Sequence, residues 1–286
     1  MDTQIVLLVL LAALLHASWN ALVKTGPDPL LLLASLHVTA ALVVIPIIFF
    51  VPLPNAECIP YLAASVAIHW LYYGLLSSAY RVGDLSHVYP LSRGIAPLLV
   101  AAVSALVAGE FLPGLTMAGI VVASGGIILL SFAHGLPWRH DPKPVVFALG
   151  TGASIAAYTV IDGLGVRHSF DAISYIAWLF LLEGATFGPF VYFLRRKQVI
   201  EHWRQRGLAL VGGGLASAGA YGLVIFAMNS NPMAMVSALR ETSVLMAALI
   251  GTLILKEGFG KTRVSAAVLV TGGVFIMNLG TRINQM

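Results

Sequence analysis

Apolar segments of about 20 residues, the length of a helix that spans the hydrocarbon core of a bilayer, follow one another along almost the whole chain. Short stretches that contain Pro, Gly or charged residues separate them. Only 10% of the residues are charged, whereas soluble domains contain about 25%, and the mean hydropathy is +0.91. We therefore expect an integral membrane protein with no sizeable domain outside the bilayer.

Ten of these segments are long enough to be transmembrane helices. Strands are an unsuitable interpretation, because membrane strands have only about 9–11 residues and alternate apolar with polar side chains. The first segment is predicted to be retained as a helix, since no basic region precedes it and no small-residue cleavage site follows it. The predicted helices are residues 3–23, 30–51, 59–80, 86–108, 113–132, 144–165, 171–194, 207–228, 233–255 and 263–280.

One stretch of the sequence is present twice. Val88 to Glu110 recurs 147 residues later as Met235 to Glu257, and Arg93 is matched to Arg240. The first two helices of each half match less well. A repeat of about half the chain indicates two copies of one structural unit.

We place the two units at residues 1–135 and 136–286. Five helices is an odd number, so the second unit enters the membrane from the opposite side to the first. The predicted fold is an all-α polytopic membrane protein, with ten transmembrane helices in two inverted five-helix repeats. Such repeats place a substrate site near the midplane of the membrane and permit alternating access.

The basic residues indicate topology rather than nucleic-acid binding. The net charge is +4, but most Lys and Arg residues lie in short loops, and the predicted loop from Arg195 to Arg206 is the most basic. Twelve of them fall on one side of the predicted bundle, and only Arg167 and Arg282 on the other. The positive-inside rule then places both termini outside the cytoplasm. The single Cys58 excludes an internal disulfide, and no cysteine pair suggests a metal site.

A glutamate closes the fourth and ninth predicted helices, and a double glycine lies inside the fifth and tenth. With ten helices in two halves, this pattern resembles the EamA-type transporters of the drug/metabolite transporter superfamily over essentially the whole chain. The resemblance implies a multi-pass secondary transporter of the bacterial inner membrane with both termini in the cytoplasm, which is opposite to the charge count. The residues concerned are Glu110, Glu257, Gly125, Gly126, Gly272 and Gly273.

The segment His16-Ala17-Ser18-Trp19-Asn20, followed by Lys24, also resembles a branch of this family that is associated with phosphonate-utilisation operons. His16, Trp19 and Asn20 share one helical face. They could form one wall of a cavity, with an aromatic surface and an amide for hydrogen bonding. A buried histidine is also often a simple interhelical donor, and the same alternative applies to His37 and His69, which lie inside other predicted helices.

Arg93 and Arg240 are the most unusual residues of the predicted helices. A guanidinium at membrane depth costs at least about 2.5–3.5 kcal/mol, and this group binds phosphate or carboxylate with two hydrogen bonds. Inverted symmetry places both at mirrored depths facing one cavity, which predicts a pair of anion-binding arginines. Alternatively each is neutralised internally, Arg240 by Glu241 or Glu183, or extends to the membrane surface.

Glu183, in the middle of the seventh predicted helix, could pair with an arginine, bind a substrate amine or carry a proton. Glu241 is a second candidate for these roles. Because it follows Arg240 directly, it is expected to point about 100° away around the helix, and the two need not pair. The proton-coupling candidates are Glu183, His16 and Glu241.

Tyr73 and Tyr221 occupy repeat-related positions, and with Tyr72 they could orient a substrate or simply pack between helices. The glutamates that end the fourth and ninth helices are expected to have a structural role. The predicted substrate-binding residues are Arg93, Arg240, Glu183, His16, Trp19, Asn20, Tyr73, Tyr221 and His69.

The sequence favours an alternating-access secondary transporter of a small anionic or zwitterionic metabolite, such as an amino acid, organic acid or organophosphonate. No nucleotide-binding motif is present, so an ion gradient or exchange would supply the energy. The alternatives are an exporter of amphipathic or cationic metabolites and drugs, or a passive channel or structural membrane subunit. An intramembrane enzyme is disfavoured, because neither a Gly-x-Ser-x-Gly elbow nor a paired-aspartate motif occurs.

We expect no cofactor, no metal and no nucleic acid as partners. The expected partners are the substrate, membrane lipids and a coupling proton or ion, in a monomer or weak homodimer.

Overall fold

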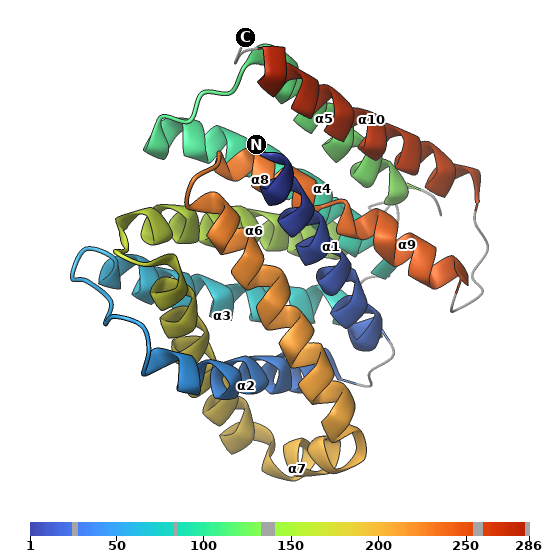
Figure 1. Cartoon of the computed structure of the whole chain (residues 1–286). Helices are drawn as coiled ribbons and strands as arrows, with labels where there is room; N and C mark the ends of the chain where they lie inside the picture. The colour runs from blue at the N-terminus through green and yellow to red at the C-terminus, as the bar shows by residue number, and fades with distance from the viewer. Residues whose placement is uncertain (25–27, 83–84, 133–140, 254–259, 284–286) are drawn as a thin grey trace.

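The computed structural model describes the chain except for residues 25–27, 83–84, 133–140, 254–259 and 284–286. Every regular element in the described residues is a helix, which confirms the predicted all-helical class. The helices are α1 (Thr3–Lys24), α2 (Pro29–Ile48), α3 (Ile59–Val82), α4 (Leu85–Ala108), α5 (Gly114–Leu130), α6 (Lys143–His168), α7 (Ala172–Met228), α8 (Met233–Arg240), α9 (Ser243–Leu253) and α10 (Lys261–Ile283). Figure 1 shows their arrangement.

Seven of the described helices are long and apolar enough to cross a membrane. Large apolar side chains such as Phe49, Leu106 and Phe193 are more than 80% exposed on the outside of the bundle, whereas Arg93, Glu183 and other polar residues are buried within it. This inversion of the soluble pattern suits a lipid environment, where polar groups need internal partners. The protein is a multi-pass membrane protein.

Two predicted helices and the loop between them form one long element, α7. The loop predicted from Arg195 to Arg206 is helical in the structure, so that prediction was wrong. The chain nevertheless changes direction at Arg195, whose φ of −140° and ψ of 39° are not helical. Arg195 also forms an ion pair of 2.5 Å with Asp28, which caps the start of α2 by accepting from the backbone of Leu30 and Leu31.

The ninth predicted helix, by contrast, is divided. α8 ends at Arg240, and α9 begins at Ser243. Between these two helices, backbone hydrogen bonds join residues that are three apart in the sequence, as in a 3₁₀ turn. An example is the bond from Val244 N–H to Glu241 O. The division lies about 11 Å from the start of α8, at a rise of 1.5 Å per residue.

Close packing at glycines holds several helix pairs together. α5 and α10 lie side by side (Figure 1), and a Cβ added at Gly119 would lie 2.4 Å from the backbone nitrogen of Met277. α2 packs on the first part of α7 in the same way, since a Cβ at Gly184 would lie 2.3 Å from the carbonyl oxygen of His37. Small residues allow backbones to approach this closely in membranes.

The two ends of the bundle differ. At the end where α4 and α6 finish and α8 begins, which we call the Glu110 face, Arg167 pairs with Glu110 at 2.6 Å. Arg167 also donates to the carbonyl oxygens of Met228 and Asn231, and Glu110 accepts from the backbone N–H of Met233. These contacts join the end of α4 to elements of the second half of the chain. We call the opposite end, marked by the Asp28–Arg195 pair, the Asp28 face.

Candidate functional site

A cavity of about 60 Å³ lies in the middle of the bundle among α1, α2, α3, α6, α7 and α8. One water needs about 10–15 Å³ of such space, so the cavity has room for several waters or a small solute. Seven of the predicted substrate-binding residues line it: His16, Trp19, His69, Tyr73, Glu183, Tyr221 and Arg240. The structure adds His37, Tyr72 and Tyr158, together with Leu33, Ala40, Phe180, Ser217, Ala218 and Ala220.

The cavity extends toward the Asp28 face. Two of its lining residues, Trp19 and Leu33, lie within five residues of the ends of α1 and α2 at that face. On the side of the Glu110 face, Met228, Met233 and Val236 are fully buried. Packed side chains therefore fill the bundle near the Glu110 face.

Two other predicted substrate-binding residues do not line the cavity. The Asn20 amide donates to the carbonyl oxygen of His16 in its own helix, at 2.8 Å. Arg93 is buried, and its Nε lies 2.7 Å from Oε2 of Glu241. The expectation that both arginines face the cavity therefore holds for Arg240 only.

Arg93 and Arg240 share the carboxylate of Glu241. Arg240 Nη2 lies 3.2 Å from Oε1 of Glu241, whereas Arg93 Nε lies against the other oxygen, Oε2. Arg240 thus pairs with Glu241, one of the two acids expected to neutralise it internally, although adjacent residues of a helix point about 100° apart. Two guanidinium groups and one carboxylate leave this triad with a net charge of +1, and arginine does not lose its proton in proteins.

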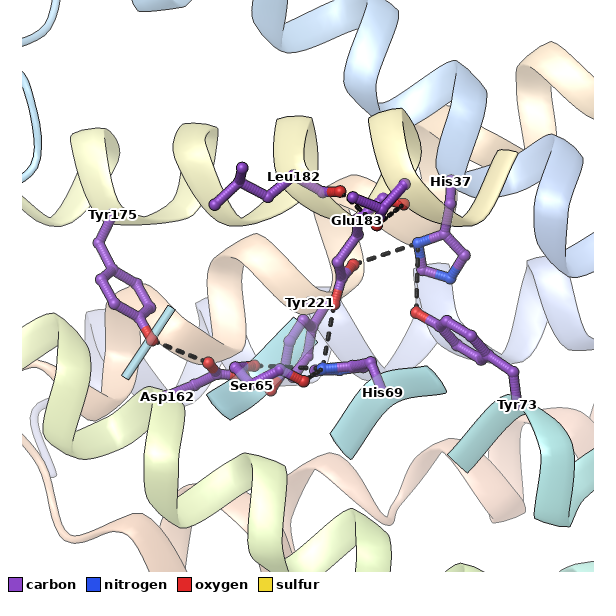
Figure 2. A network of polar contacts seen from close by, with 10 residues as sticks. His37, Ser65, His69, Tyr73, Asp162, Tyr175, Leu182, Glu183 and Tyr221 are labelled. Carbon is purple, nitrogen blue, oxygen red and sulfur yellow. Dashed lines mark hydrogen bonds and ion pairs between the residues drawn. The ribbon is translucent and has the colours of Figure 1, made fainter. Parts of the chain in front are cut away.

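A second polar group surrounds Glu183, as Figure 2 shows. His69 Nδ1 lies 3.0 Å from Oε1 of Glu183, and His37 Nδ1 lies 3.2 Å from Oε2. His69 Nδ1 also lies 2.9 Å from the carbonyl oxygen of Ser65. A carbonyl and a carboxylate only accept hydrogen bonds, so this ring nitrogen carries a proton.

Aromatic rings line the cavity beside the charged groups. The ring of Tyr158 stacks on His69 with 4.1 Å between centroids, and it meets Tyr221 edge-on at 5.5 Å. His16 and Trp19 form another edge-on pair at 4.9 Å on α1. The cavity thus has an aromatic wall, with an arginine and a glutamate as its charged lining residues.

Asp162 is not among the site residues predicted from the sequence. Its side chain is fully buried on α6 and accepts hydrogen bonds from the hydroxyls of Tyr175, at 2.9 Å, and Tyr221, at 2.5 Å. An acidic residue inside the predicted helix 144–165 is the same signal that singled out Glu183, so the sequence could have revealed it. The role of Tyr158 is not visible in the sequence, because it depends on which face of α6 meets α3.

Glu110 does not line the cavity. Its pairing with Arg167 at the end of the bundle agrees with the structural role expected of it. Its repeat partner Glu257 lies outside the described residues. In the described part of the chain, His, Cys, Asp and Glu do not gather in a group of three or more that could hold a metal ion.

Comparisons with known proteins bear on the second half of the chain and on the fold. Residues 142–279 match the model of the EamA-like transporter family. None of the curated proteins matches the sequence. A crystal structure described only as that of a protein is similar over 100% of both chains, with a TM-score of 0.78 and 19% identity. At this identity the likeness concerns the fold alone. The family match does not include residues 16–24, on which the resemblance to the phosphonate-associated branch depends.

Proposed function

We propose, from the match of residues 142–279 to the EamA-like transporter family, that this membrane protein is a secondary transporter of a small zwitterion. The substrate would carry a carboxylate or phosphonate at one end and an ammonium group at the other. The observation that carries this proposal is that Arg240 and Glu183 line the same cavity.

The charges around the cavity favour a zwitterion over a simple anion. The Arg93–Glu241–Arg240 triad has a net charge of +1, and Arg240 is its member at the cavity. Its contacts with Glu241, at 3.2 and 3.3 Å, are longer than the 2.7 Å contact of Arg93. Arg240 can therefore turn toward a substrate anion while Arg93 keeps Glu241 in place. Arg93 is then a positioning residue rather than half of a clamp.

The lining around Glu183 suits an ammonium group. Glu183 offers a carboxylate whose neighbours are histidines, and Tyr73, Tyr158 and Tyr221 lie around it. Phenol oxygens and ring faces both attract a cation. The opposite charges of Arg240 and Glu183 would orient the substrate.

Alternating access between two inverted repeats, at residues 1–135 and 136–286, would carry the substrate across the membrane. The family match falls inside the second unit. If α7 counts as two crossings that meet at Arg195, and α8 with α9 as one, the described helices amount to ten crossings. The packing supports the pseudo-symmetry, because α6 contacts α3 and α4 while α1 contacts α7, α8 and α9.

Uptake into proteoliposomes tests the proposal. We expect saturable uptake of at least one of glycine, L-alanine and 2-aminoethylphosphonate by the wild-type protein. Arg240→Gln removes a charge-assisted hydrogen bond worth about 1.5–3 kcal/mol, so we expect its uptake at low substrate concentration to fall about 10- to 150-fold. Arg282→Gln, at an exposed position near the end of α10, is the matched control. Full activity of Arg240→Gln would contradict the proposal.

Export of an organic cation is a second candidate, which the aromatic wall and Glu183 favour. The two functions differ in which charged residue they need. A cation exporter would lose activity in Glu183→Gln and keep it in Arg240→Gln. Stabilisation of the purified protein by tetraphenylphosphonium, and not by the three zwitterions, would decide for this candidate, because a bound ligand raises the unfolding temperature.

A further inference from the structure

Asp162 is a buried carboxylate without an arginine or lysine as its partner in the described part of the chain. The described arginine ion pairs involve Glu241, Glu110 and Asp28 instead. Its own neighbours are the hydroxyls of Tyr175, Tyr221 and Ser65. A carboxylate buried in this way is costly in its charged form, so a proton is the available means of neutralising it.

The groups that face Asp162 come from two helices. α7 provides Tyr175, Tyr221 and, further away, Glu183, while α3 provides Ser65 and His69. His69 bridges the two carboxylates, since its Nδ1 lies 3.0 Å from Glu183 and 3.2 Å from the Ser65 hydroxyl that also bonds to Asp162. Figure 2 shows this chain of contacts.

The link between Asp162 and the cavity is Tyr221. Asp162 does not line the cavity, whereas Tyr221 lines it and donates its hydroxyl hydrogen to Oδ2 of Asp162. Tyr175 donates to the other oxygen, Oδ1. Because a phenol has one hydrogen and two acceptor lone pairs, the state of Asp162 determines what Tyr221 presents to a substrate.

We propose that Asp162 binds the coupling proton of the transporter, and that Tyr221 reports its protonation to the substrate site. With Asp162 ionised, the Tyr221 hydroxyl donates to it, and the phenol oxygen accepts from a substrate ammonium group. With Oδ2 protonated, Asp162 donates to the Tyr221 oxygen, and the Tyr221 hydrogen turns toward the cavity, where it meets the ammonium hydrogens.

A proton on Asp162 and an ammonium group beside Tyr221 therefore exclude each other. Binding of the substrate releases the Asp162 proton to water, and rebinding of that proton expels the substrate. The outcome is exchange of one proton for one substrate molecule. This inference rests on the proposed function for the nature of the substrate, but proton binding by Asp162 does not depend on it.

Infrared titration of the purified protein tests proton binding without any substrate. We expect the C=O band of a protonated carboxyl to appear as the pH is lowered and to be missing in Asp162→Asn. Glu201→Gln, at an exposed position of α7, should keep the band. A band that persists unchanged in Asp162→Asn, or a wild-type protein without one, would overturn the proposal.

The pH dependence of glycine binding tests the coupling. For one released proton, the affinity of the wild-type protein should fall about tenfold per pH unit below the titration of Asp162. Tyr221→Phe should keep the infrared band but bind glycine with the same affinity across this range, and it serves where Asp162→Asn does not fold. A pH dependence unchanged in Tyr221→Phe would overturn the coupling.

The same measurements are made with L-alanine and 2-aminoethylphosphonate. If the wild-type protein binds none of the three, the proposed function fails, and the infrared titration alone then decides whether Asp162 is a proton site. The two proposals can therefore fail separately.

Discussion

The shared carboxylate of Glu241 shows what an arginine inside a membrane needs. Each buried guanidinium requires an anionic neighbour, and here one acid serves two of them. The two buried arginines could be predicted from the sequence, because a cationic residue inside an apolar segment can be recognised without the structure. It did not predict the contact of Arg93 with Glu241, since the two lie in different halves of the chain.

Removal of the Glu241 carboxylate should therefore lower the stability of the protein, although Glu241 does not line the cavity. In Glu241→Gln, Arg93 and Arg240 remain buried without a counter-charge, and loss of one partner of a buried ion pair costs about 3–5 kcal/mol. We expect a correspondingly lower unfolding temperature of the purified protein in detergent.

A double-mutant cycle provides the control for this prediction. Arg93→Met in the Glu241→Gln background removes one of the two unpaired charges and should restore part of the lost stability. If Glu241→Gln unfolds at the wild-type temperature, the triad is not a structural element of the bundle.

At the scale of helices, the double glycines of the sequence separate into two kinds. A Cβ at Gly273 would lie 2.5 Å from the backbone nitrogen of Ala123 on α5, whereas nothing lies within 4 Å of one at Gly272. The double glycines of the sequence correctly predicted close packing between helices. It could not say which glycine of each pair faces the partner helix, because that depends on the rotation of α10.

Alanine substitutions at the two adjacent glycines should separate these roles. Gly273→Ala forces α5 and α10 apart, and such overpacking costs about 1–3 kcal/mol. Gly272→Ala meets open space and should be neutral or slightly stabilising, because alanine favours a helix over glycine by about 1 kcal/mol. Thermal unfolding of the two variants is the measurement, and equal effects would contradict the packing of α5 on α10.

The predicted and observed helices differ at two places, the loop predicted at residues 195–206 and the division between α8 and α9. Tertiary contacts explain both differences. Charge predicted a loop at residues 195–206, yet Lys, Arg, Gln and Glu are good helix formers, and the stretch contains neither Pro nor Gly. The division at residues 241–242 likewise occurs without Pro or Gly. Tertiary contacts, including the Arg195–Asp28 pair and the Arg93–Glu241–Arg240 triad, determine the backbone structure at both places.

For the whole molecule, the contacts at the Glu110 face are expected to act as a gate between the two halves. The single Cys58 is buried at this face and lies in the same apolar cluster as Tyr175 and Met233. Burial raises the pKa of the Cys58 thiol, which leaves less of the reactive thiolate at neutral pH. Native Cys58 is therefore a reporter of opening.

Weakening the gate should expose this thiol. Glu110→Gln breaks the pairing with Arg167, and we expect Cys58 to react faster with a maleimide than in the wild-type protein. In both proteins the rate should increase as the pH rises toward the raised pKa, because the thiolate is the reacting form. A labelling rate unaffected by Glu110→Gln would show that this ion pair does not hold the face closed.

The orientation in the membrane is a further prediction at this scale. The excess of Lys and Arg at the Asp28 face places that face in the cytoplasm and both termini outside. Alkaline phosphatase fused to the C-terminus in bacteria should therefore be active. Fluorescence of a C-terminal green fluorescent protein, with an inactive phosphatase fusion, would support the orientation that the family resemblance implies.

The charge of the Arg93–Glu241–Arg240 triad follows from one difference between the two matching stretches of the sequence, Val88 to Glu110 and Met235 to Glu257. In the repeat, Arg93 corresponds to Arg240, but Glu241 corresponds to Gly94. A Cβ at Gly94 would lie 2.5 Å from the Ile128 side chain on α5, so the first half has no space for an acid there. A symmetric pair of halves would carry an even charge, either two arginines alone or two arginines with two acids. Packing between α4 and α5 thus leaves one positive charge in excess, and it determines the sign of the solute end that Arg240 can accept.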